Sequence, residues 1–502
     1  MIRNILEYLE ETVRQVPEKL AFADGERHLT FRQTHDQARS IGSFLLHRDL
    51  GGKAVAVFME KQPRTVAAFL GAVYAGCYYV PLDPEMPRPR LQQILSRLEP
   101  GSILCDQGTQ EVARTLGERV FRYEEAAFGI IDEKALGKVR EKQLDIDPVY
   151  VVFTSGSTGV PKGVVGCHRS VIDYIEQLVP VLGCGRDTVF GNQTPLYFDA
   201  CLKEILPTLK FGATTYLIPR GMFRFPMQLI DYLNRYRINT LCWVVSALTM
   251  LSALGALETN KPRFVRTVAF ASEVFPPAQL NRWRKALPGC LFLNLYGPTE
   301  TTGICCYYRV ERDFSREERI PIGRPFPNTQ ILLLDEGGQL ADPGEICIRG
   351  TRLTLGYYRE AERTAESFVP NPLNTLYPET IYRTGDLGKW NDRGELVFVS
   401  RKDYQIKHMG HRIELGEIEV NVNMLDGIQT SCCIYDKATD KIVLYYVGDM
   451  ELKALVTVLR EKLPRYMIPN KVMKLDTMPL TANGKLDRVA LKARFEAEKK
   501  ER

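Results

Sequence analysis

The stretch 149–163, VYVVFTSGSTGVPKG, decides how the rest of this 502-residue chain is interpreted. Its first five residues are β-branched or aromatic, which is typical of a buried strand. The next ten supply hydroxyls, glycines and a lysine that can surround phosphate oxygens, and glycine permits close approach. A Walker motif, GxxxxGK[ST], cannot be drawn through it. We predict a strand followed by a phosphate loop, with a flexible Gly/Ser loop as the alternative. The residues expected to bind ATP in the phosphate loop are Thr154, Ser155, Gly156, Ser157, Thr158, Gly159 and Lys162.

Outward from this stretch, short apolar runs such as AVAVFME and RTVAFAS alternate with helical patterns such as PRTVAAFLGAVYAG. This alternation predicts an α/β fold with buried strands. From about Ile322 the pattern changes to strands and turns, as in GEICIRG and GELVFVSRKD, which predicts a barrel-like or antiparallel unit. The last hundred residues return to a compact α+β pattern, and we expect them to form a small domain.

The composition is that of an ordinary globular protein, with 45% hydrophobic residues, 25% charged residues and a net charge of +5. The sequence has no long Lys/Arg block that could bind along the phosphate backbone of a nucleic acid, so we expect no nucleic acid partner. The twelve cysteines are scattered without a CxxC pair, which indicates reduced thiols in a cytoplasmic protein. The uncharged segment 240–257 approaches the length of a membrane span, but its composition favours a strand running into a buried helix, and we expect no membrane segment.

Further motifs show that the phosphate loop does not stand alone. TSGSTGVPKG resembles the phosphate loop of the adenylate-forming superfamily, which includes acyl-CoA synthetases, luciferases and the adenylation domains of nonribosomal peptide synthetases. That family's other motifs follow in order: LGAVYAGCYYVPLDPEMPRPRL, NLYGPTE, GEICIRGTRLTLGYYR, YRTGDL, SRKDYQIKHMGHRIELGEIE and PLTANGKLDR. The resemblance spans nearly the whole chain. It implies a ligase that uses ATP and Mg²⁺ to activate a carboxylic acid as an acyl-AMP and then passes the acyl group to a thiol.

The resemblance also implies roles for single residues around the nucleotide. Tyr296 is expected against adenine, Thr299 at the α-phosphate and Glu300 on Mg²⁺. Asp386 is similar to the residue that accepts both ribose hydroxyls, and Arg401 to a basic residue on the nucleotide. The alternatives are a buried turn for YGPTE and surface ion pairs for the other two residues. The remaining ATP-binding positions of this motif are Asn294, Leu295, Gly297 and Pro298.

Lys485 in the motif ANGK is the predicted catalytic residue. A flexible ammonium stem can reach both the attacking carboxylate and the α-phosphate; a solvated turn lysine is the alternative. By resemblance, residues 1–402 form the adenylation core and residues 403–502 a small mobile lid that carries Lys485. Asp403 matches the hinge position, where a turn or helix-capping acid is the other interpretation.

Asp199 is the strongest indicator of the substrate class. Amino-acid-activating members have a similar aspartate that pairs with the substrate α-ammonium, a group that demands a buried counter-charge; a helix N-cap is the alternative. The other substrate positions carried over are Ala200, Lys203, Ala271, Leu295, Gly303 and Lys485. Lys203 either meets an acidic or polar substrate side chain or extends to solvent. The chain is similar to stand-alone D-alanine carrier protein ligases, although Ala271 stands where those have a cysteine.

The acceptor is expected to be the phosphopantetheine thiol of a separate carrier protein, because nothing after PLTANGKLDR resembles a fused carrier segment. The alternative is an acyl-CoA synthetase that uses free coenzyme A. A non-enzymatic adenylate-binding regulator is disfavoured, because the predicted catalytic, metal and ribose residues are all present. The basic residues Lys402, Lys407, His408, His411 and Arg412 either steer an acidic carrier or form a solvated face.

Overall fold

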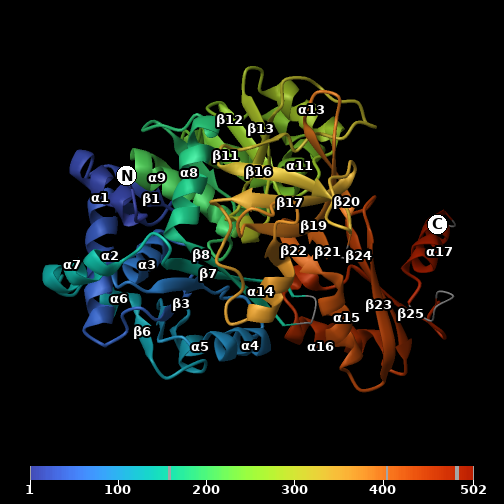
Figure 1. Ribbon diagram of the computed structural model, residues 1–502, viewed down its shortest axis with the longest axis horizontal. Coiled ribbons are helices and arrows are strands. Elements are labelled where there is room, and N and C mark those ends of the chain that lie inside the picture. The colour runs from blue at the N-terminus through green and yellow to red at the C-terminus, as the bar shows by residue number, and fades with distance from the viewer. Residues whose placement is uncertain (1, 157–159, 403–404, 481–485, 501–502) are drawn as a thin grey trace. The chain divides into compact units, whose positions relative to one another are not determined.

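The computed structural model describes residues 2–156, 160–402, 405–480 and 486–500 (Figure 1). By its internal contacts the chain divides into two units. The first comprises Met1–Pro84, Leu98–Val152 and Gly163–Lys402. The second comprises Glu85–Arg97, Phe153–Lys162 and Asp403–Arg502. All twelve cysteines are free. No described helix is long and apolar enough to cross a membrane.

A six-stranded sheet has the order β6-β5-β3-β4-β7-β8. Its pairs β5/β6, β3/β5, β3/β4 and β4/β7 are parallel. The strands are β3 (Ala54–Phe58), β4 (Tyr78–Pro81), β5 (Ser102–Cys105), β6 (Val120–Arg122), β7 (Pro148–Thr154) and β8 (Lys162–Cys167). The helices between them are α3 (Pro63–Tyr74), α4 (Arg88–Leu98), α5 (Gln110–Arg114), α6 (Tyr123–Ala127) and α7 (Glu133–Lys142).

Helix α3 begins with proline at its first turn and is apolar all round, so it is buried along almost its whole length. It packs closely against α2 (Phe31–Leu46), which begins with a capping box between Thr30 and Gln33. A Cβ at Gly71 would lie 2.5 Å from Ile41 Cγ2, so only glycine permits this approach of the two helices.

A nine-stranded sheet has the order β15-β14-β13-β12-β11-β9-β10-β1-β2. It is parallel from β13 to β1, and antiparallel strands complete both ends. The strands are β1 (Leu20–Ala23), β2 (His28–Thr30), β9 (Val189–Asn192), β10 (Thr214–Leu217), β11 (Thr240–Val244), β12 (Thr267–Ala271), β13 (Leu291–Tyr296), β14 (Cys306–Arg309) and β15 (Arg324–Pro325). Its helices are α8 (His168–Leu182), α9 (Leu202–Phe211), α10 (Pro226–Arg235), α11 (Val245–Ala253), α12 (Ala256–Thr259) and α13 (Pro277–Ala286).

The uncharged segment 240–257 forms buried strand β11 followed directly by helices α11 and α12, as the sequence predicted. Trp243 in β11 is fully buried, and its indole nitrogen donates to the carbonyl of Gly191 at 2.6 Å. The segment is therefore apolar because it lies in a protein core.

The antiparallel unit predicted after Ile322 is a five-stranded sheet. It is built from β16 (Thr329–Leu334), β17 (Gly344–Gly350), β18 (Phe368–Pro370), β19 (Thr380–Trp390) and β20 (Leu396–Arg401), with α14 (Ala361–Ser367) between β17 and β18. Register shifts interrupt the pairing of β19 with both β17 and β20, which bends the long central strand. The predicted fold class, α/β regions followed by a curled antiparallel sheet and a small α+β region, is confirmed.

The carboxyl-terminal part has a hydrophobic core of its own, which includes Ile413, Ile418, Leu444 and Leu455. The hairpin β21 (Gln405–His408) and β22 (His411–Glu414) leads into α15 (Leu415–Asn423). A three-stranded sheet follows, made of β23 (Ile428–Asp436), β24 (Lys441–Gly448) and β25 (Lys471–Lys474), with helices α16 (Leu452–Lys462) and α17 (Arg488–Lys500).

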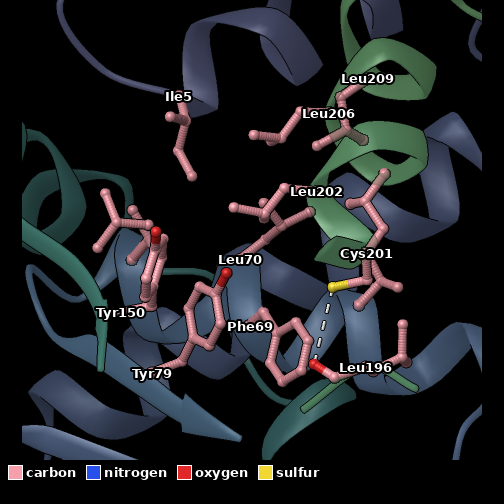
Figure 2. Close-up of a cluster of buried hydrophobic side chains, with 14 of the residues drawn as sticks. Ile5, Phe69, Leu70, Tyr79, Tyr150, Leu196, Cys201, Leu202, Leu206 and Leu209 are labelled. Carbon is pink, nitrogen blue, oxygen red and sulfur yellow. Dashed lines mark hydrogen bonds between the residues drawn. The ribbon is translucent and has the colours of Figure 1, made fainter. Parts of the chain in front are cut away.

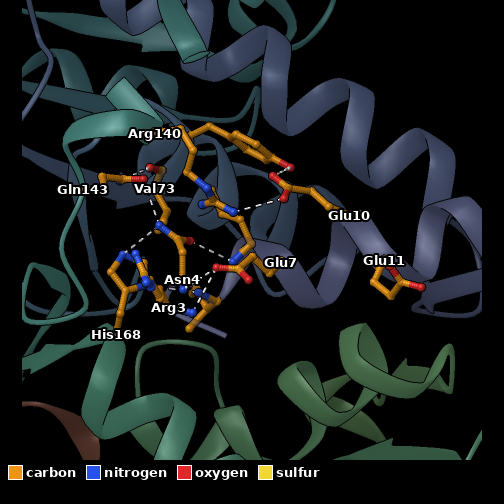
Figure 3. Close-up of polar contacts among 12 residues, drawn as sticks. Arg3, Asn4, Glu7, Glu10, Glu11, Val73, Arg140, Gln143 and His168 are labelled. Atoms are coloured by element: carbon orange, nitrogen blue, oxygen red, sulfur yellow. Dashed lines mark hydrogen bonds and ion pairs between the residues drawn. The ribbon is translucent and has the colours of Figure 1, made fainter. Parts of the chain in front are cut away.

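The amino-terminal helix α1 (Leu6–Gln15) is amphipathic and buries Leu6, Tyr8, Leu9 and Thr12. Side chains at its beginning hold it in place, as Figure 3 shows. Asn4 Nδ2 donates to Gln143 Oε1 at 2.8 Å, and the backbone nitrogen of Ile5 donates to His168 Nδ1 at 3.2 Å. Burial, together with Arg140, lowers the pKa of His168 to about 3, so this imidazole stays neutral and accepts the bond.

Candidate active site

The phosphate-loop sequence joins β7 to β8, which puts it directly after a buried strand as predicted. Thr154 is the last residue of β7 and Lys162 the first of β8; both side chains are buried, as is Ser155. Thr154 Oγ1 has no hydrogen-bond partner within the described part of the chain. A buried hydroxyl in this position is suited to a polar ligand. Ser157, Thr158 and Gly159 lie outside the described residues.

Parallel strands of the nine-stranded sheet end in polar or small residues at one edge. Asn192 ends β9, Ala271 ends β12 and Tyr296 ends β13. Ala271 and Leu295 are direct neighbours across β12 and β13. Ligands bind outside the carboxyl ends of strands in such sheets, so this edge is the natural place for a site.

Asp386, within β19, connects to the last residues of two other strands of the first unit, β13 and β20. Its Oδ2 accepts from the Tyr296 hydroxyl at 2.5 Å, and its Oδ1 accepts from Arg401 Nη1 at 2.5 Å. Asp386 and Arg401 are opposite each other in the register of β19 and β20. Asp386 is only 3% exposed, so its ion pair with Arg401 is buried. It is therefore not the surface ion pair that was the alternative from the sequence. A carboxylate has about four lone-pair positions, so it retains acceptor capacity beyond these two bonds.

The YGPTE motif forms a tight turn followed by the short 3₁₀ helix η3 (Thr299–Thr301). Gly297 is required here, because a Cβ would lie 2.1 Å from the carbonyl oxygen of Gly303. Glu300 is fully buried and its Oε1 accepts from the Tyr357 hydroxyl at 2.8 Å. Asn294 Nδ2, on the preceding strand, donates to the carbonyl of Pro321 at 2.8 Å. Pro298 is the residue before η3.

Asp199 lies beside the YGPTE motif, one hundred residues away in sequence. It begins the 3₁₀ turn η1 (Asp199–Cys201), is 9% exposed, and accepts from Thr299 Oγ1 at 3.3 Å. Burial raises its pKa to about 6; Lys203 opposes this effect and Glu300 adds to it. No side-chain cap bond is present at η1 or α9 within the described residues, so helix capping does not explain Asp199.

Lys203 follows on α9 and is 3% exposed, so its side chain does not extend to solvent. The next residue, Glu204, is fully buried and accepts a short hydrogen bond from Asn192 Nδ2. Burial raises the pKa of Glu204 to about 7, and Lys61 and Lys203 oppose that shift. Lys61 Nζ in turn donates to the carbonyls of Asn192, Gln193 and Ile218 at 3.0, 3.0 and 3.1 Å. No sequence motif indicated Lys61, Asn192 or Glu204.

Two of the predicted substrate-binding residues, Ala200 and Gly303, have no charged side chain. Ala200 lies in η1, and Gly303 adopts a positive φ of 89° after the YGPTE turn. Lys485 and Asp403 lie outside the described residues. Among the described residues, no group of three or more His, Cys, Asp or Glu side chains could hold a metal ion.

Two of the basic residues considered for steering a carrier are engaged locally. Lys402 Nζ donates to Glu345 Oε2 at 3.2 Å, and His408 Nδ1 lies 2.9 Å from Asp440 Oδ1. His411 stacks on Tyr466 with ring centroids 3.6 Å apart. The ion pair of Lys402 with Glu345 reduces the charge available for steering, and the steering role stays a hypothesis.

Comparison with known proteins gives the class. Residues 9–358 match the family described as AMP-binding enzyme, and the chain belongs to this family. This is the family that the motifs predicted.

Among curated relatives, the chain is 32% identical over 521 residues to L-proline–[L-prolyl-carrier protein] ligase of Streptomyces coelicolor. This alignment covers 96% of this chain and 95% of that protein. It is 31% identical over 501 residues to bacitracin synthase 1 of Bacillus licheniformis, covering 97% of this chain but only 9% of that much longer protein. The solved structure of holo-PA1221, an NRPS protein containing adenylation and PCP domains, superimposes with a TM-score of 0.84 at 26% identity and covers 98% of this chain and 84% of that one.

Proposed function

We propose that this protein is an ATP-dependent amino acid–carrier protein ligase. It activates an amino acid as aminoacyl-AMP, releases pyrophosphate and transfers the aminoacyl group to the phosphopantetheine thiol of a separate carrier protein. The observation that carries the proposal is the buried carboxylate of Asp199 beside Thr299. The likeness to a prolyl-carrier protein ligase along almost its full length supports it.

Asp199 binds the substrate α-ammonium in this proposal. A buried carboxylate without a capping role meets the need of an ammonium leaving water for a charged hydrogen-bond partner. Because Thr299 donates to the same carboxylate, the amino acid is bound next to the residue expected at the α-phosphate. Proximity of the substrate carboxylate to the α-phosphorus is the main requirement for the attack that expels pyrophosphate.

Asp386 and Tyr296 hold the nucleoside. Arg401 and the Tyr296 hydroxyl fix the orientation of the Asp386 carboxylate, whose remaining lone pairs accept the two ribose hydroxyls. The aromatic ring of Tyr296 lies against adenine. Both side chains are held by these hydrogen bonds, so little order has to be created on binding.

Glu300 fits Mg²⁺ as one ligand among several. Magnesium commonly takes one or two protein carboxylates and fills its shell with phosphate and water oxygens, so a cluster of acidic residues is not needed. The ion, when bound, neutralises phosphate charge. Tyr357 holds the Glu300 carboxylate in position through its 2.8 Å hydrogen bond.

The two-part arrangement carried over from the family is part of the proposal: residues 1–402 form the core and residues 403–502 the lid, with a hinge at Asp403. The separate hydrophobic core of the carboxyl-terminal part supports it. Lys485 on this lid supplies positive charge to the attacking carboxylate and the α-phosphate during adenylation.

The experiment that tests the function follows both half-reactions with purified protein. Amino-acid-dependent ATP–pyrophosphate exchange reports adenylation, and intact-mass measurement of a panel of phosphopantetheinylated carrier proteins reports transfer. We expect exchange with an α-amino acid, D-alanine being one member of the panel, and loading of a carrier. Saturable transfer to free coenzyme A with no carrier loaded would instead make the protein an acyl-CoA synthetase.

A further inference from the structure

The turn that follows the YGPTE motif has a strained backbone. Directly after η3 the chain reverses through the buried residues Thr302, Gly303 and Ile304. Thr302 and Gly303 both have a positive φ, of 55° and 89°. A positive φ is unfavourable for a β-branched residue such as Thr302, and it persists only where the surrounding structure fixes it. The carbonyl oxygen of Gly303 lies against Gly297, so a shift of this turn would displace the YGPTE segment itself.

Arg352, between β17 and α14, makes contacts that fix this turn. Its carbonyl oxygen accepts from Thr302 Oγ1 at 2.8 Å, and its Nη1 donates to the carbonyl of Ile304. Two residues further on, the backbone nitrogen and the hydroxyl of Thr354 both donate to the carbonyl of Glu300 at 3.0 Å. This short segment therefore holds the chain both before the turn and within it.

Asp173 on α8 fixes the Arg352 guanidinium. Its Oδ2 accepts from Arg352 Nε at 3.0 Å, and its Oδ1 accepts from Asn328 Nδ2 at 2.9 Å. Apolar residues such as Ile175 anchor α8 in the hydrophobic cluster that Figure 2 shows around Leu202. The ion pair therefore connects the strained turn to a well-packed part of the core.

The stability of the fold does not account for this ion pair. Arg352 is completely buried, and the side chain of Asp173 is only 10% exposed. Arg352 Nη2 has no hydrogen-bond partner among the residues the structure describes, which adds to the cost of burying the charge. Replacing such a pair with apolar side chains of similar size is often neutral or stabilising. What a planar guanidinium supplies instead is direction, because it donates to Asp173 and to the Ile304 carbonyl at fixed angles.

We infer that Arg352 and Asp173 are positioning residues for the adenylation step. Acting through the turn, they hold Thr299 and Glu300 in the one arrangement that receives the α-phosphate and Mg²⁺. The inference rests on the proposed function, which assigns those two contacts, and deepens it by naming the residues that orient them. Arg352 and Asp173 need no contact with the nucleotide in this role.

Pyrophosphate exchange with the full chain at varied Mg²⁺ concentration tests the inference. In Arg352→Met we expect kcat to fall on the order of 10-fold or more, because Thr299 and Glu300 lose their fixed geometry. The Mg²⁺ concentration that gives the half-maximal rate should rise. Arg140→Met is the matched control, because Arg140 pairs with Glu10 at 3.0 Å in the same unit but outside the site, and it should leave the Mg²⁺ dependence unchanged.

Arg352→Lys tests whether direction or charge matters. We expect it to behave like Arg352→Met, because an ammonium that pairs with Asp173 does not also reach the Ile304 carbonyl. Wild-type exchange in Arg352→Lys would contradict positioning through the turn.

Isothermal titration gives a readout that does not require turnover. Arg352→Met should bind adenosine as tightly as the wild type does, because Asp386 and Tyr296 hold the nucleoside in the proposed function. The same variant should bind MgATP more weakly. Equal affinity of the variant and the wild type for MgATP would contradict the inference.

The double variant Asp173→Leu with Arg352→Met separates positioning from folding. It removes both buried charges, so its melting temperature should equal or exceed that of the wild type, while exchange stays slow. Recovery of wild-type exchange in the double variant would reduce the pair to a structural role and overturn the inference. The single variants, assayed well below their melting temperatures, keep the test decisive if the double variant does not fold.

The failure of this inference differs from failure of the proposed function. An unchanged kcat and Mg²⁺ dependence in Arg352→Met would overturn the positioning role and leave amino acid activation intact. Exchange by the wild-type protein with fatty or aryl acids and with no amino acid would overturn the proposed function, whatever the variants do.

Discussion

Replacing Asp199 with asparagine separates an ammonium-binding role from a structural role. The carboxylate is 9% exposed, so a substrate ammonium that meets an amide there has lost water without gaining a counter-charge. The full cost of such an unpaired charge is about 3–5 kcal/mol. The burial that raises the Asp199 pKa to about 6 is a cost of folding, so removing the charge changes stability and does not restore binding. We expect a loss of about 3 kcal/mol, or roughly 10²-fold in kcat/KM for the amino acid.

Stability gives the second readout for Asp199→Asn. A carboxylate whose folded pKa is raised destabilises the folded state when it is ionised, so its effect on stability is unfavourable above about pH 6 and disappears below the unfolded pKa. The melting temperature of the variant at pH 7.5 should therefore be unchanged or higher. Asp132→Ala is the control, because Asp132 does cap a helix, accepting from the Ala135 nitrogen at 2.9 Å, and its loss should lower stability but not activity.

The assay is pyrophosphate exchange at several amino acid and ATP concentrations, with melting curves for both variants. We expect Asp199→Asn to affect the amino acid parameters and to leave the KM for ATP nearly unchanged. Unaltered use of amino acids, or a loss of stability like that of the capping control, would refute the ammonium-binding role.

The remaining predictions concern the catalytic lysine, the nucleoside and pH. Lys485→Ala should slow adenylation by about 3 kcal/mol, roughly 10²-fold, in pyrophosphate exchange but spare thioester formation from preformed aminoacyl-AMP; equal loss in both steps would contradict its role. Asp386→Asn should raise the KM for ATP by on the order of 10-fold or more without changing that for the amino acid, and an unchanged ATP dependence would exclude the ribose contact. The kcat/KM for the amino acid should rise with pH through about 6 as Asp199 ionises and then level off; a midpoint nearer 7 that is lost in Glu204→Gln would assign the titration to Glu204.

Local sequence patterns predicted the elements well. The uncharged stretch 240–257 was correctly predicted as a strand and buried helix, because its β-branched start and small residues have the composition of a core. The alternation of apolar runs and amphipathic segments predicted the α/β layers, and the motifs predicted that Asp199 and Thr299 belong to one site.

Buried charges were the part that sequence reasoning missed. In ACLKEIL the acid and base have the appearance of a solvated helix face, because Lys and Glu are rarely fully buried. Here Glu204 is completely buried through partners on β9 and in the segment before α3, Asn192 and Lys61, which no local pattern links to it.

The most direct test of the central claim compares the best amino acid substrate with its des-amino analogue, which keeps the same side chain and carboxylate but lacks the α-ammonium. The measurement is kcat/KM in ATP–pyrophosphate exchange with the wild-type protein. Because Asp199 is buried and binds the ammonium in our account, the amino acid should be preferred by about 10²-fold or more. Equal use of the two acids would contradict amino acid activation at this site.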